Sequence, residues 1–166
     1  MIVDILQLST SNSNNMAKKI EIVNRKAEYE YNFLSKHEAG IMLVGSEVKS
    51  IRKGQAGLKD AYCLFDKGEL YIRSMYIREY DNATFINHES RRTRKLLLRK
   101  PELKKLERRV KEKGLTIVPY RIYFSERNIV KVEVALAQGK KSYDKRESIK
   151  AKDTKRDLER MRKVKF

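Results

Sequence analysis

The chain has 166 residues, 40% of them hydrophobic, which is enough for one domain with a modest core. Its 39 Lys and Arg against 22 Asp and Glu give a net charge of +17, which predicts an anionic partner: nucleic acid first, a membrane surface second. No apolar run approaches the roughly 18 residues that span a bilayer. The single cysteine, Cys63, excludes an internal disulfide and fits a reducing cytosol.

The first 16 residues differ in composition from the rest. Residues 1–8 are apolar without a basic segment before them, so a secretory signal is not expected. A Ser/Asn-rich run follows and predicts disorder. Met16-Ala17-Lys18-Lys19 resembles a second start. We therefore expect residues 1–16 to be a disordered extension, either an over-extended gene prediction or a dispensable arm.

Residues 17–138 carry the apolar patterns of a folded domain. Alternating apolar residues predict strands at 20–23, through most of 28–44, at 61–65, 69–77, 115–124 and 129–137. Asn24-Arg25-Lys26 is expected to be a basic turn. Gly40 predicts a bulge or a close backbone approach, and Pro119 an edge or a bulge.

Two short helices are expected between these strands. One starts at Gly45-Ser46-Glu47 with Ser46 as its cap and ends at Gly54. The other runs from Pro101 to Lys113, with an apolar stripe of Leu103, Leu106 and Val110. About six strands, with too few βα alternations for a parallel sheet, predict a mainly β domain: an OB-fold-like antiparallel barrel, closed or nearly closed.

A cationic tail follows the last strand. Residues 139–166 contain 12 Lys or Arg against 5 Asp or Glu, and no apolar pattern comparable to that of the strands returns. The junction combines Gly139, four cations and one aromatic, Tyr143. This mixture suits a groove lined with phosphates and stackable bases, so RNA is the favoured partner.

Five motifs occur together in the chain, in one order and spacing. They are Asn24-Arg25-Lys26-Ala27, Glu38-Ala39-Gly40-Ile41, Gly45-Ser46-Glu47-Val48-Lys49-Ser50-Ile51-Arg52, Arg92-Thr93-Arg94-Lys95-Leu96-Leu97-Leu98 and Gly139-Lys140-Lys141-Ser142-Tyr143-Asp144-Lys145-Arg146. In register they resemble the SsrA-binding protein (small protein B) family of bacterial trans-translation, from about residue 18 to about residue 152. The extension before Met16 departs from the family pattern, and the match loosens after Asp153.

The resemblance implies an OB-like barrel that binds the tRNA-like domain of transfer-messenger RNA (tmRNA). It implies a cytoplasmic, monomeric adaptor that, with elongation factor Tu, delivers the alanyl-charged RNA to ribosomes stalled without a complete codon. Asn24, Glu38 and Leu97 stand where the family binds that RNA. The full set expected at the RNA interface is Asn24, Arg25, Lys26, Glu38, Lys49, Arg52, Arg92, Arg94, Lys95 and Leu97.

The resemblance also implies a ribosomal role for residues 139–166. They are expected to be disordered in the free protein and to become helical in the decoding centre and the empty mRNA channel, where small-subunit rRNA lines the wall. Stacking of Tyr143 on a nucleobase is the sharpest of these expectations. The residues expected to act there are Gly139, Lys140, Lys141, Tyr143, Asp144, Lys145, Arg146 and, from the loosely matching end, Met161, Arg162 and Lys163.

Some of these residues have a second interpretation. The cations Arg92, Arg94 and Lys95 suit phosphate contact, but such a run also solvates an exposed turn. Glu38 could be satisfied by backbone N–H groups, accept hydrogen bonds from nucleobase amino groups, or orient a neighbouring basic side chain. Leu97 is more often a core residue than a contact, so its RNA role depends on the resemblance.

An RNA-processing enzyme is the first rival function. It would need clustered carboxylates for metal ions or a His acid–base pair, and His37 and His88 have no partner at such spacing. No catalytic residue, metal or cofactor is therefore expected. The alternative function is a general ribosome-associated RNA-binding protein. A membrane-surface binder is disfavoured, because the apolar residues of the tail form no wide face.

Overall fold

The computed structural model describes residues 20–81, 87–141, 146, 149–150, 153–154, 156–158 and 160–161. Its strands are β1 Glu21–Val23, β2 Tyr31–Ile41, β3 Ala56–Gly57, β4 Tyr62–Asp66, β5 Glu69–Arg73, β6 Tyr76–Ile77, β7 Arg94–Leu97, β8 Thr116–Phe124 and β9 Val130–Gly139. The helices around them are α1 Arg25–Glu30, α2 Gly45–Arg52 and α3 Lys100–Lys113.

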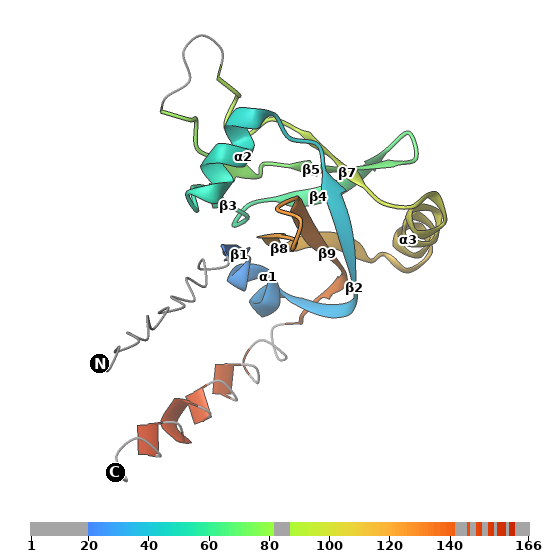
Figure 1. Ribbon diagram of the computed structural model, residues 1–166. Coiled ribbons are helices and arrows are strands. Elements are labelled where there is room, and N and C mark those ends of the chain that lie inside the picture. Colours follow the sequence, from blue (N-terminus) through green and yellow to red (C-terminus); the bar gives the residue numbers. More distant parts are fainter. Residues whose placement is uncertain are drawn as a thin grey trace, which may run out of the picture.

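Seven of the strands form one antiparallel sheet in the order β1-β8-β9-β2-β7-β5-β4, and β3 pairs with β6 separately. The sheet curls, so that β4 contacts β8 (Figure 1), but within the described residues no ladder joins the edge strands β1 and β4. The predicted fold class is confirmed: the protein is mainly β, with an OB-like antiparallel sheet that is not closed into a barrel.

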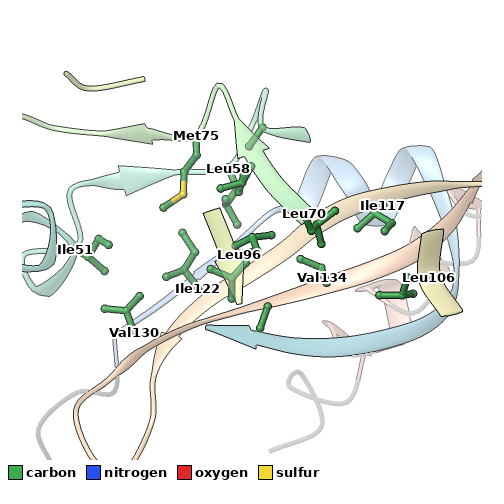
Figure 2. Packing of buried hydrophobic residues seen from close by; sticks show 14 of the residues in the cluster. Ile51, Leu58, Leu70, Met75, Leu96, Leu106, Ile117, Ile122, Val130 and Val134 are labelled. Carbon is green, nitrogen blue, oxygen red and sulfur yellow. The ribbon is translucent and has the colours of Figure 1, made fainter. Parts of the chain in front are cut away.

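The core fills the inside of the curled sheet. Alternate residues of β9, Val130, Val132, Val134 and Leu136, are all buried, as their period of two predicts. Figure 2 shows Ile51 from α2 and Leu106 from α3 in the same cluster as the strand residues. Cys63 packs against this cluster, and burial raises the pKa of its thiol, so it is a core residue rather than a reactive one.

Helix α3 begins one residue before its predicted start and ends at the predicted residue. Its proline lies in the first turn, and Gly114 ends the helix with φ of 58°, a left-handed conformation that costs glycine little. Leu103 and Val110 pack against the core on either side of buried Leu106. The opposite face of α3 is left to solvent.

Two local predictions are wrong, and one alternative is met only in part. The segment from Arg25 forms α1 instead of a turn, because the Asn24 side chain accepts a hydrogen bond from the Ala27 N–H at 3.1 Å and caps the helix. Ser46 does not cap α2, because Val44 occupies the N-cap position and Ser46 bonds to His88 at 2.9 Å. The basic run at 91–95 begins in an exposed turn at Arg91 and continues into β7 at Arg94, so the alternative of a solvated turn fits only its first part.

Two irregularities of the sheet were expected. The bulge at Pro119 is confirmed by a register shift between Pro119 and Arg121. The bulge in β2 lies between Phe33 and Ser35 rather than at Gly40. The close approach at Gly40 is confirmed: a Cβ there would lie 3.3 Å from the Leu97 Cβ.

Candidate nucleic-acid interface

Leu97 lies on the outer face of β7. Strand alternation buries Leu96 and leaves Leu97 48% exposed, opposite Gly40 of β2. A side chain at position 40 would crowd Leu97, so the glycine leaves room for the Leu97 side chain at the surface. An apolar side chain in this position is available to a partner rather than to the core.

A groove of about 540 Å³ opens beside Leu97, between the β4–β5 turn, β7 and the start of α3. Leu98 and Leu103 also lie along it, so its floor is apolar. Its walls carry Lys67, Lys95, Lys100, Lys104 and Glu69. An apolar floor inside a cationic rim suits a nucleotide, whose base is flat and whose phosphate is negative.

Glu38 projects from the outer face of β2. Its carboxylate accepts a hydrogen bond from the Tyr123 hydroxyl and pairs with the Lys131 ammonium at 3.1 Å. Lys131 comes from β9, which lies next to β2 in the sheet, and Tyr123 comes from β8, one strand further away. Of the three interpretations of Glu38, the contact that orients a basic side chain is present, whereas RNA binding by Glu38 stays a prediction.

These contacts shift the acidity of both groups. The hydrogen bonds from Tyr123 and Lys131 lower the pKa of Glu38, so the carboxylate is charged at neutral pH. Burial and the bond to Glu38 raise the pKa of Tyr123 to about 12, so its hydroxyl keeps its proton and donates. At physiological pH the charged Glu38 carboxylate therefore accepts the Tyr123 hydrogen bond and pairs with Lys131.

A second ion-pair group continues across the same face. Arg121 of β8 contacts Glu21 of β1 at 2.7 Å and also pairs with Glu133 of β9. Its guanidinium lies 5.0 Å from the Tyr123 ring centroid and so joins the two groups. Sequence reasoning missed Arg121, Tyr123 and Lys131, although the period of two along β8 and β9 places them outward.

The prediction of phosphate contact by Arg94 is not compatible with its burial. Its side chain is 0% exposed and bonds to Glu47 at 2.8 Å and to the carbonyls of Met75 and Ser90 at 2.7 and 3.2 Å. Arg92 is partly exposed, but two of its nitrogens already bond to Glu47. Much of the cationic motif therefore holds the fold rather than facing solvent.

Glu47 is the centre of this network, and sequence reasoning did not select it as a functional residue. It is fully buried, and burial alone would raise its pKa. The hydrogen bonds from Arg92, the Val44 N–H and Arg94 outweigh burial and lower the pKa of Glu47. The ion pairs tie the start of α2 to β7 and to the residues before it.

Lys95 faces the groove described above. Its ammonium pairs with Glu69 of β5, which also accepts a hydrogen bond from the Tyr71 hydroxyl at 2.8 Å. The Glu69 carboxylate raises the pKa of Lys95, so this amine stays protonated. Lys95 is accessible to an anion that competes with Glu69.

Asn24, Arg25 and Lys26 lie at the start of α1. Asn24 is only 5% exposed, and its amide donates to the carbonyls of Leu58 and Pro119 at 2.9 and 3.1 Å. A direct RNA contact by this side chain is therefore not compatible with the structure. Arg25 and Lys26 are exposed, and Lys26 lies 3.9 Å from both Glu30 and Asp60.

Lys49 and Arg52 point outward from α2, as predicted. Lys49 lies 5.2 Å from the Tyr80 ring centroid, and Arg52 lies 5.7 Å from that of Phe124. Both are exposed. The structure thus brings Leu97 and Lys95 together at one groove, but not all the predicted RNA residues.

The junction to the tail is anchored to α1. Gly139 ends β9 opposite Tyr31, and Lys140 donates its backbone N–H to the Glu30 carbonyl at 2.9 Å and its ammonium to the Glu28 carbonyl at 3.0 Å. Lys141 follows, at the end of this described segment.

The described tail residues from Arg146 to Met161 have helical backbone conformation and are exposed. Arg160 pairs with Asp157 at 3.6 Å, the kind of helical charge pair that the sequence suggested. Tyr143, Asp144, Lys145, Arg162 and Lys163 lie outside the described residues, so their roles stay predictions.

The histidines have packing roles. His88 is buried between Ser46 and the Ile77 carbonyl, and His37 bonds to Ser35 at 3.0 Å. Within the described ranges, no group of three or more His, Cys, Asp or Glu could hold a metal ion. In that same part of the chain, no helix is long and apolar enough to cross a membrane.

Comparison with known proteins is consistent with an RNA interface. The family model described as "SmpB protein" matches residues 21–164. The SsrA-binding protein of Cytophaga hutchinsonii is 54% identical over 147 residues, covering 89% of this chain and 96% of that protein. The SsrA-binding protein of Syntrophobacter fumaroxidans is 49% identical over 156 residues, covering 93% of this chain and 96% of its own.

A solved structure is also similar. A chain of the structure described as "tmRNA-SmpB: a journey to the center of the bacterial ribosome" has a TM-score of 0.63 and 46% sequence identity to this protein. The match covers 74% of this chain and 86% of that chain. Sequence and fold therefore point to the same relatives.

Proposed function

Because the chain belongs to the SmpB family of SsrA-binding proteins, we propose that it is an RNA-binding adaptor of bacterial trans-translation. It binds the tRNA-like domain of tmRNA and brings it to stalled ribosomes. Family membership is the observation that carries this proposal. The relatives are named for binding SsrA, and the structural neighbour is described as tmRNA-SmpB in the ribosome.

The geometry supports a binding role on the curled sheet. Leu97 and Lys95 lie at a groove with an apolar floor and a cationic rim, and Glu38 holds Lys131 on the outer face of the sheet. Both arrangements offer a partly exposed lysine on a paired strand, which positions it for a phosphate without a large ordering cost.

Two further partners belong to the proposal. Elongation factor Tu would meet the protein through the alanyl-charged RNA, and the small ribosomal subunit and its rRNA through residues 139–166. That segment carries 12 of the 39 Lys and Arg, which suits an rRNA-lined channel without message. The site of action is then the cytoplasm, where translation takes place.

The test is recovery of RNA with the full-length protein from bacterial cells. We expect one abundant species, tmRNA, and in-vitro affinity for tmRNA that falls on the order of 10³-fold or more between about 50 and 200 mM salt, as six to ten phosphate contacts require. Recovery of many RNAs without enrichment of tmRNA would favour the general ribosome-associated protein instead.

A further inference from the structure

The solvent face of α3 carries a second hollow that continues the groove at Leu97. It has a volume of about 400 Å³ and is lined by Lys104, Glu107, Arg108 and Lys111. Lys104 also lines the groove, so the two hollows meet at this residue. Figure 1 shows α3 beside the β4–β5 turn, where the groove begins. We call the two hollows together the α3 track.

The α3 track is strongly cationic. Its two carboxylates both have partners, since Glu69 pairs with Lys95 and Glu107 pairs with Lys111 at 2.7 Å. Six Lys and Arg side chains line the track against these two carboxylates. The cations that line it are Lys67, Lys95, Lys100, Lys104, Arg108 and Lys111.

The cations and the apolar surface of the track are placed to meet the phosphates and a base of a nucleotide chain, respectively. Lys104 and Lys111 are seven residues apart, which is about 10 Å along the helix axis and enough for successive phosphates. The leucine floor lies at one end only, beside Leu97. A backbone along α3 would thus place one base at the leucines and its neighbouring phosphates at the helix.

We propose that the α3 track holds a segment of tmRNA, with its phosphates along α3 and one unstacked base on the leucine floor. The proposal rests on the function proposed above and extends it to Lys67, Lys100, Lys104, Arg108 and Lys111. The anionic, repeating backbone of RNA matches the track in charge along its whole length, and this complementarity selects RNA as the occupant.

Helix α3 offers a matched pair of variants for the test. Lys104→Gln with Arg108→Gln removes one Lys and one Arg, four residues apart, from the track. Lys105→Gln with Arg109→Gln removes the same two charges with the same spacing from the same helix, but neither residue lines either of the two hollows that make up the track. All four residues are exposed, so both double variants should fold, which thermal unfolding would check.

The readout is the salt dependence of tmRNA binding by the full chain. Each lost phosphate contact lowers the slope of log K against log salt by about 1, so the track variant should lose about two units. Its affinity at about 0.15 M salt should fall roughly 25-fold, because each contact contributes about fivefold there. The control variant should keep nearly the parent's slope.

Lys67→Gln, on the opposite wall of the groove, repeats the test without altering α3 and should lower the slope by about one unit. If the parent binds tmRNA and both double variants have equal slopes, the α3 track is wrong while the proposed function stands. Unchanged RNA binding with loss of co-purified proteins would mark the track as a protein-docking surface and also overturn it. If the parent does not bind tmRNA, both proposals fail.

Discussion

The buried carboxylate of Glu47 joins two arginines and a helix start in one network. It accepts hydrogen bonds from Arg92, Arg94 and the Val44 N–H, and Arg94 in turn binds the carbonyls of Met75 and Ser90. A buried charge is stable only while it is paired, because desolvation is not repaid otherwise. This network therefore acts on the stability of the fold, whether or not RNA is bound.

Glu47→Gln should lower the free energy of unfolding by about 3–5 kcal/mol, because it leaves the fully buried Arg94 without its countercharge. Urea denaturation measures this. Asp81→Asn is the control, since Asp81 pairs with Arg78 at the surface and such pairs contribute at most about 1 kcal/mol. A loss for Glu47→Gln no larger than that of the control would contradict the prediction.

The same carboxylate makes stability depend on pH. The folded pKa of Glu47 lies below its usual value, so its contribution is fully present above about pH 4.5 and is lost as the pH falls through the folded pKa. The difference in unfolding free energy between the parent and Glu47→Gln should therefore shrink with acidification below about pH 4.5. A difference that stays constant down to pH 2 would contradict this origin.

Gly40 offers a test of how Leu97 is held at the surface. A Cβ at position 40 would come within 3.3 Å of the Leu97 Cβ, so Gly40→Ala should displace Leu97 and cost about 1 kcal/mol of stability as overpacking. It should also weaken tmRNA binding more than its stability loss explains. Gly57→Ala is the control, because no atom lies within 4 Å of its added Cβ. Equal RNA affinity of the two variants would count against the role of Gly40.

At the scale of elements, α1 depends on the side chain of its N-cap residue, which directly follows β1. Asn24 caps the helix and its amide also bonds to the Leu58 and Pro119 carbonyls, which fixes α1 against β8 and the segment before β4. The Lys140 backbone N–H bonds to the last residue of the same helix. Helix α1 thus links the sheet to the start of the C-terminal tail.

Asn24→Ala should cost about 2 kcal/mol, because a cap and two buried hydrogen bonds are lost together. Urea denaturation and tmRNA binding would be measured on the same protein. The affinity should match the parent's at temperatures where the variant is folded, since the side chain is buried. Arg25→Ala should leave stability within about 0.5 kcal/mol. Weak RNA binding by an Asn24→Ala variant of parental stability would restore the direct contact that the family resemblance implies.

At the scale of the whole molecule, the chain divides into a packed body and a tail. Residues 139–166 carry 12 Lys or Arg against 5 Asp or Glu, and the described residues among 146–161 are all exposed. The body nevertheless extends beyond the expected boundary at residue 138, because Gly139 pairs with Tyr31 and Lys140 bonds to α1. Lys141 is therefore the better end for a truncated protein.

A variant that ends at Lys141 should have a free energy of unfolding within about 0.5 kcal/mol of the parent's, because the contacts of the body are kept. It should bind free tmRNA with similar affinity. It should fail to support tagging on ribosomes stalled on a message without a stop codon. Reconstituted translation measures the tagging. Parental tagging by the truncated protein would contradict a ribosomal role for the tail.

The sequence alone determined the features that local periodicity and composition encode. The alternation of apolar residues predicted the long strands β8 and β9, and Pro101 and Gly114 marked the two ends of α3. The net charge of +17 and the basic tail predicted an RNA partner. Family motifs added the residues Glu38 and Leu97. These features can be read from the sequence because each depends on composition or on residues near one another in the chain.

Only the tertiary structure decided which charges face solvent. Arg94 and Asn24 were expected at the RNA interface and are buried, while Arg121, Lys131 and Lys104 were not chosen and lie at the surface. Glu47 and Arg94 are 47 positions apart, and β8, β9 and β2 bring Tyr123, Lys131 and Glu38 together. A charged residue is buried or exposed according to partners that the fold supplies from distant segments, and no local pattern encodes those partners.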